Sequence, residues 1–292
     1  MSKLNIIRDI CDSSDVLFLQ ETWAMPADLT EFNCVSEQHN SYAISAVDPG
    51  ELLCGRPYGG LTIIWRKSID HLCRIVTFDD NRMLGLMVDF PGNPILFINV
   101  YLPYYSEHNV DDYIFYVGKV MSIIDELEGC GVMVFGDFNA CVGGTYYQQW
   151  VSACEEYELT FSDVTHLPAT SYTHVNNCSL SRSWLDHCLT SQTVHSCIAD
   201  VSIDYNYHGS VHFPILVDLR IPSIQSVQIV ECDSYRVKWD FSDDPKTDRF
   251  YNLIRERLAA SDLNHHCFRE KCTVNSHCKW VDCMWTEFTN VI

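Results

Sequence analysis

The stretch between residues 132 and 139 constrains the fold of this chain more than any other. It reads VMVFGDFN, an apolar run that ends on a glycine and is followed by an acid, an aromatic ring and an amide. A short apolar run bounded by glycine predicts a buried strand. Such a strand places Asp137 and Asn139 at its carboxyl-terminal end, on a rigid support from which polar side chains can act.

Other segments of the first 221 residues carry the patterns of strands and of a few helices. Helices are predicted at residues 4–10 and 111–127, and strands at residues 15–21, 59–65, 83–90, 94–101, 184–189 and 213–219. The strands outnumber the helices, and a Pro-Gly-Asn turn at residues 91–93 joins two of them as a hairpin. We therefore expect an α/β (α+β) fold, a four-layer α/β/β/α sandwich. In it, two mixed, largely antiparallel sheets pack face to face with helices outside.

The charge of the chain limits which partners it can bind. Lys and Arg number 19 against 39 Asp and Glu, so the formal net charge is −20. This net negative charge argues against a protein that binds nucleic acid mainly by electrostatic attraction to its phosphates. It is less unfavourable for an enzyme whose carboxylates recruit metal cations, because a bound metal offsets local negative charge.

The sequence shows no sign of export or of membrane insertion. The N-terminal residues form no apolar signal segment, and no apolar run is long enough to span a bilayer. We expect an intracellular protein without membrane association. Most of its 15 cysteines would then act as small apolar side chains.

The chain changes character after residue 221, which is where the first domain, residues 1–221, is expected to end. Residues 222–240 read as a linker with a short strand, and residues 241–292 as a helical, Cys-rich connector. The Cys and His residues from His265 to Cys283 suggest zinc, but they lack the paired C-x₂-C spacing of common zinc sites. A Cys-rich amphipathic helix or a tail is the favoured interpretation.

Acidic side chains follow several of the predicted strands, and a histidine comes after them. In chain order they are Glu21, Asp137 with Asn139, Asp186 and His212. Hydrolysis of a phosphodiester needs a divalent metal, a base for the water, an acid for the leaving oxygen and donors for the developing charge. Glu21 suits an oxygen-preferring cation such as Mg²⁺ or Mn²⁺. Asp137 suits proton transfer, and Asn139 can donate to a phosphate oxygen. His212 paired with Asp186 suits an oriented, cationic imidazole.

These residues belong to a series of motifs. In chain order the motifs are QET at 20–22, NVYLP at 99–103, GDFN at 136–139, WLDH at 184–187 and SVHFP at 210–214. The series resembles the endonuclease/exonuclease/phosphatase superfamily. The segments QETW at 20–23, GRPYGG at 55–60 and WLDHC at 184–188 are most similar to the endonuclease domain of non-LTR (LINE-type) retrotransposon polyproteins. In those polyproteins a connector like residues 241–292 precedes a reverse transcriptase.

The resemblance implies a role for each matching residue. Glu21 matches the metal-binding Glu, and Tyr101 the active-site Tyr that contacts the phosphate. Asp137 and its neighbour Asn139 match the proton-transfer Asp and its accompanying Asn. Asp186 and His212 match the Asp–His pair. The implied activity is Mg²⁺-dependent (or Mn²⁺-dependent) nicking of DNA, in the nucleus if the protein acts as a retrotransposon endonuclease. No obligate protein partner is inferred.

Two departures from the family pattern lead us to expect reduced or absent catalysis. The family's first strand, with an Asn of the metal site, would precede the helix with which this chain begins, so we expect an N-terminally truncated domain. Val211 also stands where the family has an Asp. Two alternatives stay open: a non-catalytic relic or binding module of retrotransposon origin, and a phosphoesterase acting on a small or lipid phosphate.

Overall fold

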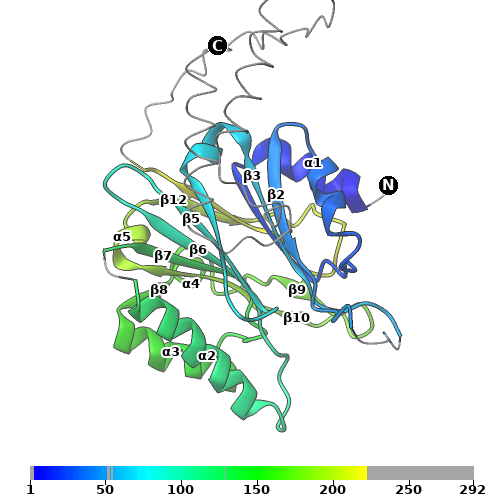
Figure 1. The fold of residues 1–292 in the computed structure, drawn as a ribbon. Helices are drawn as coiled ribbons and strands as arrows, with labels where there is room; N and C mark the ends of the chain where they lie inside the picture. The colour runs from blue at the N-terminus through cyan, green and yellow to red at the C-terminus, as the bar shows by residue number, and fades with distance from the viewer. Residues whose placement is uncertain (1–2, 51–52, 54, 128, 222–292) are drawn as a thin grey trace, which may run out of the picture. The chain divides into compact units, whose positions relative to one another are not determined.

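The computed structural model describes residues 3–50, 53, 55–127 and 129–221 (Figure 1). The first half of the described chain contains α1 (Lys3–Ser13), β1 (Val16–Gln20), η1 (Leu29–Cys34), β2 (His39–Ile44), β3 (Leu61–Arg66), η2 (Lys67–Leu72), β4 (Cys73–Thr77), β5 (Met83–Val88), β6 (Ile95–Tyr101) and α2 (Val110–Asp125). The second half contains β7 (Gly131–Asp137), α3 (Thr145–Tyr157), β8 (Leu159–Phe161), α4 (Ser162–His166), β9 (His174–Val175), β10 (Arg182–Ser183), β11 (Asp186–Ser191), α5 (Gln192–His195), β12 (Ile198–Ile203) and β13 (Ile215–Leu219).

The strands of the described residues form one large sheet and three smaller ones. The six-stranded sheet has the order β4-β5-β6-β7-β11-β8, the three-stranded sheet has the order β1-β3-β2, and β12-β13 and β9-β10 are pairs. Among the described strands only β6 and β7 pair in parallel, and α2 forms the crossover connection that a parallel pair requires. The predicted mixed α/β fold with largely antiparallel pairing is therefore confirmed.

Apolar side chains of the two larger sheets meet in one core. Leu61 and Ile63 of β3 are fully buried in the same cluster as Leu84 and Leu86 of β5. Phe18 of β1 also joins this cluster; its ring stacks at 5.1 Å on that of Phe135 in β7. These contacts place the three-stranded sheet against one face of the six-stranded sheet.

Helices α2 and α3 cover the opposite face of the six-stranded sheet (Figure 1). Tyr113 of α2 and Trp150 of α3 are completely buried against β6 and β7, where Ile98 and Val134 are also buried. The indole Nε1 of Trp150 donates to the Tyr113 hydroxyl at 2.8 Å, which satisfies both polar groups inside the core. Helix α1 packs elsewhere, with Cys11 against Ile64 on the outer face of the three-stranded sheet.

The predicted elements are present with small shifts of their bounds. The hairpin of β5 and β6, the helix α2 and the strand β7 all appear where their patterns indicated. Strands β2 and β4 and helix α3 carried weaker signals, because β2 is largely polar and α3 buries only every fourth residue. None of the described helices is long and apolar enough to cross a membrane.

The two predicted C-terminal segments, 222–240 and 241–292, lie outside the described residues, as do the Cys and His residues from His265 to Cys283. The boundary at residue 221 stays a prediction. Within the described part of the chain all nine cysteines are free thiols, and Cys11, Cys154 and Cys188 are buried as small apolar side chains.

Candidate active site

Gly136 determines how β7 delivers its acid to the end of the sheet. Its φ of 139° lies in a region that other residues rarely adopt. A Cβ at this position would also overlap the carbonyl oxygen of Val100 in the neighbouring strand β6. The glycine therefore allows β6 and β7 to stay paired up to Asp137, which is the last residue of β7 and is 7% exposed.

Strand register brings three predicted site residues side by side. Asp137 is the register partner of Tyr101 in the parallel strand β6 and of Asp186 in the antiparallel strand β11. The three side chains thus stand in a row at one end of the six-stranded sheet. The sequence separation is 36 residues between Tyr101 and Asp137 and 49 between Asp137 and Asp186.

Glu21 joins this row from the other sheet. It follows β1, and its Oε1 accepts a hydrogen bond from the Tyr101 hydroxyl. Glu21 has a φ of 50°, as has Asn139, so both adopt the left-handed region that costs a non-glycine residue on the order of 1 kcal/mol. Strain of this kind concentrates at functional sites, and here it falls on two of the six predicted site residues.

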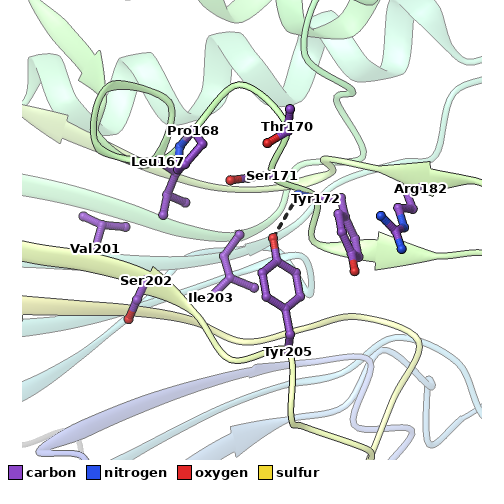
Figure 2. Close-up of a pocket in the computed structure, with 10 residues that line it drawn as sticks. All are labelled: Leu167, Pro168, Thr170, Ser171, Tyr172, Arg182, Val201, Ser202, Ile203 and Tyr205. Carbon is purple, nitrogen blue, oxygen red and sulfur yellow. Dashed lines mark hydrogen bonds between the residues drawn. The ribbon is translucent and has the colours of Figure 1, made fainter.

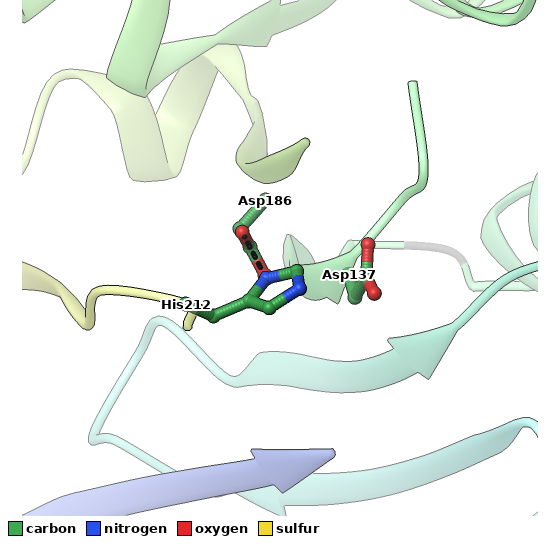
Figure 3. A group of neighbouring side chains, drawn as sticks. All are labelled: Asp137, Asp186 and His212. Atoms are coloured by element: carbon green, nitrogen blue, oxygen red, sulfur yellow. Dashed lines mark hydrogen bonds and ion pairs between the residues drawn. The ribbon is translucent and has the colours of Figure 1, made fainter. Parts of the chain in front are cut away.

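His212 lies between two of the carboxylates, as Figure 3 shows. Its Nδ1 donates to Asp186, at 2.8 Å from Oδ2 and 3.1 Å from Oδ1. Burial lowers the pKa of the imidazole, but its hydrogen bond to Asp186 and the negative charges of Asp186, Asp137 and Glu21 outweigh burial and raise the pKa to about 9. The ring is therefore cationic at neutral pH.

The pKa of Asp137 is raised as well, but for an acid this means that its charged form is disfavoured. Burial, the charge of Asp186 and, more weakly, that of Glu21 raise its pKa to about 8, although His212 and the backbone N–H of Asn139 act to lower it. The site thus holds more negative charge than its one imidazolium offsets. A divalent cation would correct this excess, and carboxylate oxygens are the ligands that Mg²⁺ prefers. Asp137, Asp186 and His212 offer ligand atoms within 4.8 Å of one another.

The chemistry of these groups favours the carboxylates over the imidazole as ligands. His212 uses Nδ1 to bind Asp186 and is charged, whereas a metal ligand must be neutral imidazole. An ion at this position would therefore be held by carboxylate oxygens rather than by His212. The prediction of Glu21 as a metal ligand stays a prediction.

Asn139 holds Asp137 in place. Its backbone N–H donates to Asp137 Oδ1 at 2.9 Å, and its Nδ2 donates to Leu102 O at 2.9 Å and to Asp137 Oδ2 at 3.3 Å. The amide is therefore already engaged with Leu102 and Asp137, and its donation to a phosphate oxygen stays a prediction. All six predicted site residues lie within this one site.

Thr173 and His174 are site residues that the motifs did not reveal. The Thr173 hydroxyl is fully buried and accepts the backbone N–H groups of Leu185 and Asp186, both at 3.0 Å, which positions Asp186. The His174 ring lies 4.7 Å from that of His212, and its Nδ1 has no hydrogen-bond partner among the described residues. Burial lowers its pKa, as does the neighbouring His212. Thr173 precedes and His174 begins the two-residue strand β9, which is too short to leave a pattern in the sequence.

Asn99 connects the two larger sheets beneath Glu21. It is completely buried, and its Nδ2 donates to Leu19 O at 3.0 Å and to Thr62 O at 3.3 Å. Its Oδ1 accepts from Gln20 Nε2 at 2.6 Å. One amide of β6 thereby pairs with groups of β1 and β3, so Glu21 is anchored to the sheet that carries the other acids.

A buried ion pair supports the opposite side of the site. Asp163 and His187 are both inaccessible to solvent, with Nδ1 of His187 at 2.7 Å from Asp163 Oδ2 and its Nε2 at 2.8 Å from Ala140 O. Both nitrogens of the ring thus face acceptors. Burial lowers the pKa of His187, but the Asp163 carboxylate outweighs it, so the pKa is raised. The pair connects α4 to the strand and loop that carry Asp186 and Asn139.

A hollow of about 460 Å³ is lined by residues that precede Thr173 in the sequence and by strand β12 (Figure 2). Tyr172 and Tyr205 line it, and the Tyr205 hydroxyl accepts the backbone N–H of Tyr172 at 3.3 Å. The Arg182 guanidinium stands 4.4 Å from the centre of the Tyr172 ring. These aromatic and cationic groups are engaged with one another, and their contacts hold in place the segment that leads to Thr173.

A protein-family model that matches most of the chain identifies the family of this protein. The profile described as Endonuclease/Exonuclease/phosphatase family matches residues 2–243. The chain belongs to this family. Its members are hydrolases of the phosphodiesterase type and are typically metal-dependent, which agrees with the excess of negative charge at the site.

Solved structures of this family share the fold. The 3′ phosphatase NExo from Neisseria, bound to a product DNA hairpin, is 16% identical with a TM-score of 0.55, and the match covers 75% of this chain and 95% of that one. The Xenopus laevis APE2 catalytic domain is 15% identical with a TM-score of 0.59, covering 73% and 86%. The AP endonuclease LMAP from Leishmania major is 15% identical with a TM-score of 0.57, covering 76% and 82%. No curated protein sequence matches the chain.

Proposed function

We propose that this protein is a Mg²⁺- or Mn²⁺-dependent phosphodiesterase that nicks DNA. The observation that carries the proposal is the row of Tyr101, Asp137 and Asp186 at one end of the six-stranded sheet, with Glu21 bonded to Tyr101 and His212 between the two aspartates. A nuclease needs these groups close together, and they come from five separate segments. The product DNA hairpin held by the Neisseria relative supports DNA as the substrate.

The metal would be held by the carboxylate of Glu21, the residue that the resemblance marks as metal-binding. Once bound, it would polarise a phosphate oxygen and offset negative charge in the transition state. Burial and, after it, the charge of Asp186 raise the pKa of Asp137, so a cation at this position would offset an unfavourable negative charge, which supports the assignment.

The remaining chemistry belongs to the side chains themselves. Beside a bound divalent cation, the pKa of Asp137 would fall from its value of about 8. Its carboxylate, buried and held by Asn139, could then take a proton from the attacking water. His212 is cationic and oriented by Asp186, so it can stabilise the charge that develops on the phosphate. Burial and the hydrogen bond to Glu21 raise the pKa of Tyr101, so its hydroxyl keeps its proton and can donate to a phosphate oxygen.

The proposal includes a retrotransposon origin and a slowed reaction. The segments at 20–23, 55–60 and 184–188 support the origin, and a nuclear location would follow from it. Val211 precedes His212 and offers only its backbone carbonyl, which accepts from Val175 N at 3.0 Å, where the resemblance places a carboxylate. We expect that substitution to reduce the rate. The successive packing of α1, the two larger sheets, and α2 with α3 supports the four-layer arrangement.

Nicking of supercoiled plasmid in MgCl₂ tests the proposal. The wild-type protein should produce open circles, and Asp137→Ala should lower the rate at least ~100-fold, because proton transfer by a positioned group contributes ~10²–10⁴-fold. Asp200→Ala removes an exposed acid of β12 and is the matched control. Val211→Asp should increase the rate.

Each failure has its own meaning. Equal nicking by wild type and Asp137→Ala would show a contaminant and refute the assignment. If no variant nicks DNA and Mg²⁺ fails to raise the melting temperature, the non-catalytic relic is the better description. Hydrolysis of bis(p-nitrophenyl) phosphate without any nicking would favour the small-phosphoester alternative.

A further inference from the structure

A second hollow, of about 540 Å³, opens beside the Glu21 side of the active site. Glu21 and Tyr101 form part of its wall, so it is continuous with the row of site residues. Its volume lies within the range of ligand pockets, ~300–1,000 Å³. We call it the aromatic cleft, and besides Tyr101 its aromatic and arginine lining comprises Trp23, Arg56, Tyr58, Arg82, Tyr104, Phe115 and Tyr116.

Three aromatic rings of the cleft face solvent. Tyr58 is 55% exposed, Tyr104 67% and Phe115 62%. They come from three separate segments: the chain before β3, the chain after β6, and α2. A soluble protein rarely gathers large exposed apolar groups in one place without a partner for them. The convergence therefore indicates a surface built to receive flat or apolar groups.

Two arginines stand among these rings. The Arg82 guanidinium lies 5.5 Å from the centre of the Tyr101 ring and 5.6 Å from that of Tyr116, and its Nη1 donates to Tyr101 O at 3.1 Å. The Arg56 guanidinium lies 4.8 Å from the Trp23 ring. In the described ranges neither arginine belongs to an ion pair. Both therefore have N–H groups available for an incoming phosphate.

The charge of the cleft differs from that of the chain. Its charged groups are Glu21, Asp112, Arg56 and Arg82, which sum to zero, whereas the whole chain carries −20. A binder of duplex DNA makes most of its contacts to phosphates with many basic side chains. Two arginines cannot supply that number of phosphate contacts. Stacking of bases on aromatic rings needs no net positive charge.

In a DNA duplex the base faces are stacked on one another, and only base edges are open in the grooves. Rings that line a cleft can stack only on bases that have left the duplex. Resting on the proposed nuclease activity, we propose that the aromatic cleft holds an unpaired stretch of the DNA strand adjoining the phosphate to be cleaved. Its bases stack on Tyr58, Tyr104 and Phe115, and its phosphates contact Arg56 and Arg82.

Binding of fluorescein-labelled oligo(dT) in an Asp137→Ala background tests the proposal without cleavage. Tyr104→Ala and Phe115→Ala should each weaken binding roughly tenfold, as loss of one stacked base does. Tyr42→Ala, which removes a 40% exposed tyrosine of β2 outside the cleft, is the matched control and should leave affinity unchanged. Equal affinity in all three variants would overturn the proposal.

The salt dependence gives a second readout. With two phosphate contacts to a single strand, the slope of log K against log[salt] should be no steeper than about −1.5. A slope near −4 would mean that phosphates rather than bases dominate, and would also overturn the proposal.

Cleavage by the wild-type protein separates this inference from the proposed function. The inference predicts faster cleavage of a duplex with a central bubble than of the same duplex fully paired, and loss of that preference in Phe115→Ala. Equal cleavage of both substrates, unchanged in Phe115→Ala, would overturn the inference and keep the nuclease. Ring-dependent oligo(dT) binding without cleavage of any DNA would keep the cleft and overturn the nuclease.

Discussion

Replacing Asp163 with alanine tests how the fold supports the aspartate end of the active site. The carboxylate accepts three hydrogen bonds: from Trp184 Nε1 at 2.9 Å, from His187 Nδ1 at 2.7 Å, and from Cys188 N at 3.0 Å. All of these groups are buried. Asp163→Ala therefore leaves three donors without an acceptor, one of them on a buried imidazolium.

The expected cost follows from those three donors. A buried donor left unpaired costs ~1–3 kcal/mol, and breaking a buried ion pair by removing one partner costs ~3–5 kcal/mol. Because the two figures describe overlapping losses, we expect about 4 kcal/mol in total, a large part of the ~5–15 kcal/mol that stabilises a typical protein. For a domain of this size the melting temperature should fall by about 10 °C.

Urea unfolding followed by tryptophan fluorescence measures the loss, with the exposed Asp200→Ala as a control that should stay within ~0.5 kcal/mol of wild type. The pKa of His187 is raised in the folded protein. Its pairing energy is therefore complete below the unfolded value of about 6.5 and is lost as the pH rises through the folded value. The difference between Asp163→Ala and wild type should thus be largest below pH 6.5. A loss smaller than ~1 kcal/mol at pH 6 would refute the reasoning.

Three further predictions concern the site and its support. Gly136→Ala should destabilise the protein by about 3 kcal/mol in urea unfolding, because the new Cβ meets the Val100 carbonyl at a strained φ; wild-type stability would contradict this. Asn99→Ala should cost ~2 kcal/mol and lower nicking, since the Leu19 and Thr62 carbonyls lose their shared donor; unchanged stability would show that water replaces the amide. Asp137→Asn in EDTA should raise stability at pH 8.5 by on the order of 1 kcal/mol. The folded pKa of about 8 means that the carboxylate costs stability as the pH rises toward that value, so the gain should shrink at pH 5. An equal gain at both pH values would refute this cause.

Local patterns in the sequence were enough to find most of the candidate site. The apolar run before Gly136 marks a strand, and glycine followed by Asp137 marks its end, because strand propensity and turn chemistry depend on neighbouring residues. The same reasoning placed Glu21 after β1. It could not find β2, whose largely polar sequence gives no alternating pattern, because pairing with β3 rather than its own composition makes it a strand.

Long-range contacts explain what sequence patterns left out. Thr173 is a site residue only because its hydroxyl meets the backbone 12 and 13 residues later, and Asn99 because its amide reaches β1 and β3, up to 80 residues earlier. Neither contact leaves a repeating pattern in the chain. The same holds for the aromatic cleft, since Tyr58 and Phe115 look like core residues until their exposure is known.

The amino-acid sequence by itself determined the identity of the acids, the glycine that lets β7 reach the sheet end, and the family to which the motifs belong. Only the tertiary structure decided that Asp137 stands between Tyr101 and Asp186, and that His212 lies against both aspartates. The physical reason is that strand order and register depend on how whole sheets pack. The chemistry of one residue is a local property, whereas its charge environment is set by groups that folding brings together.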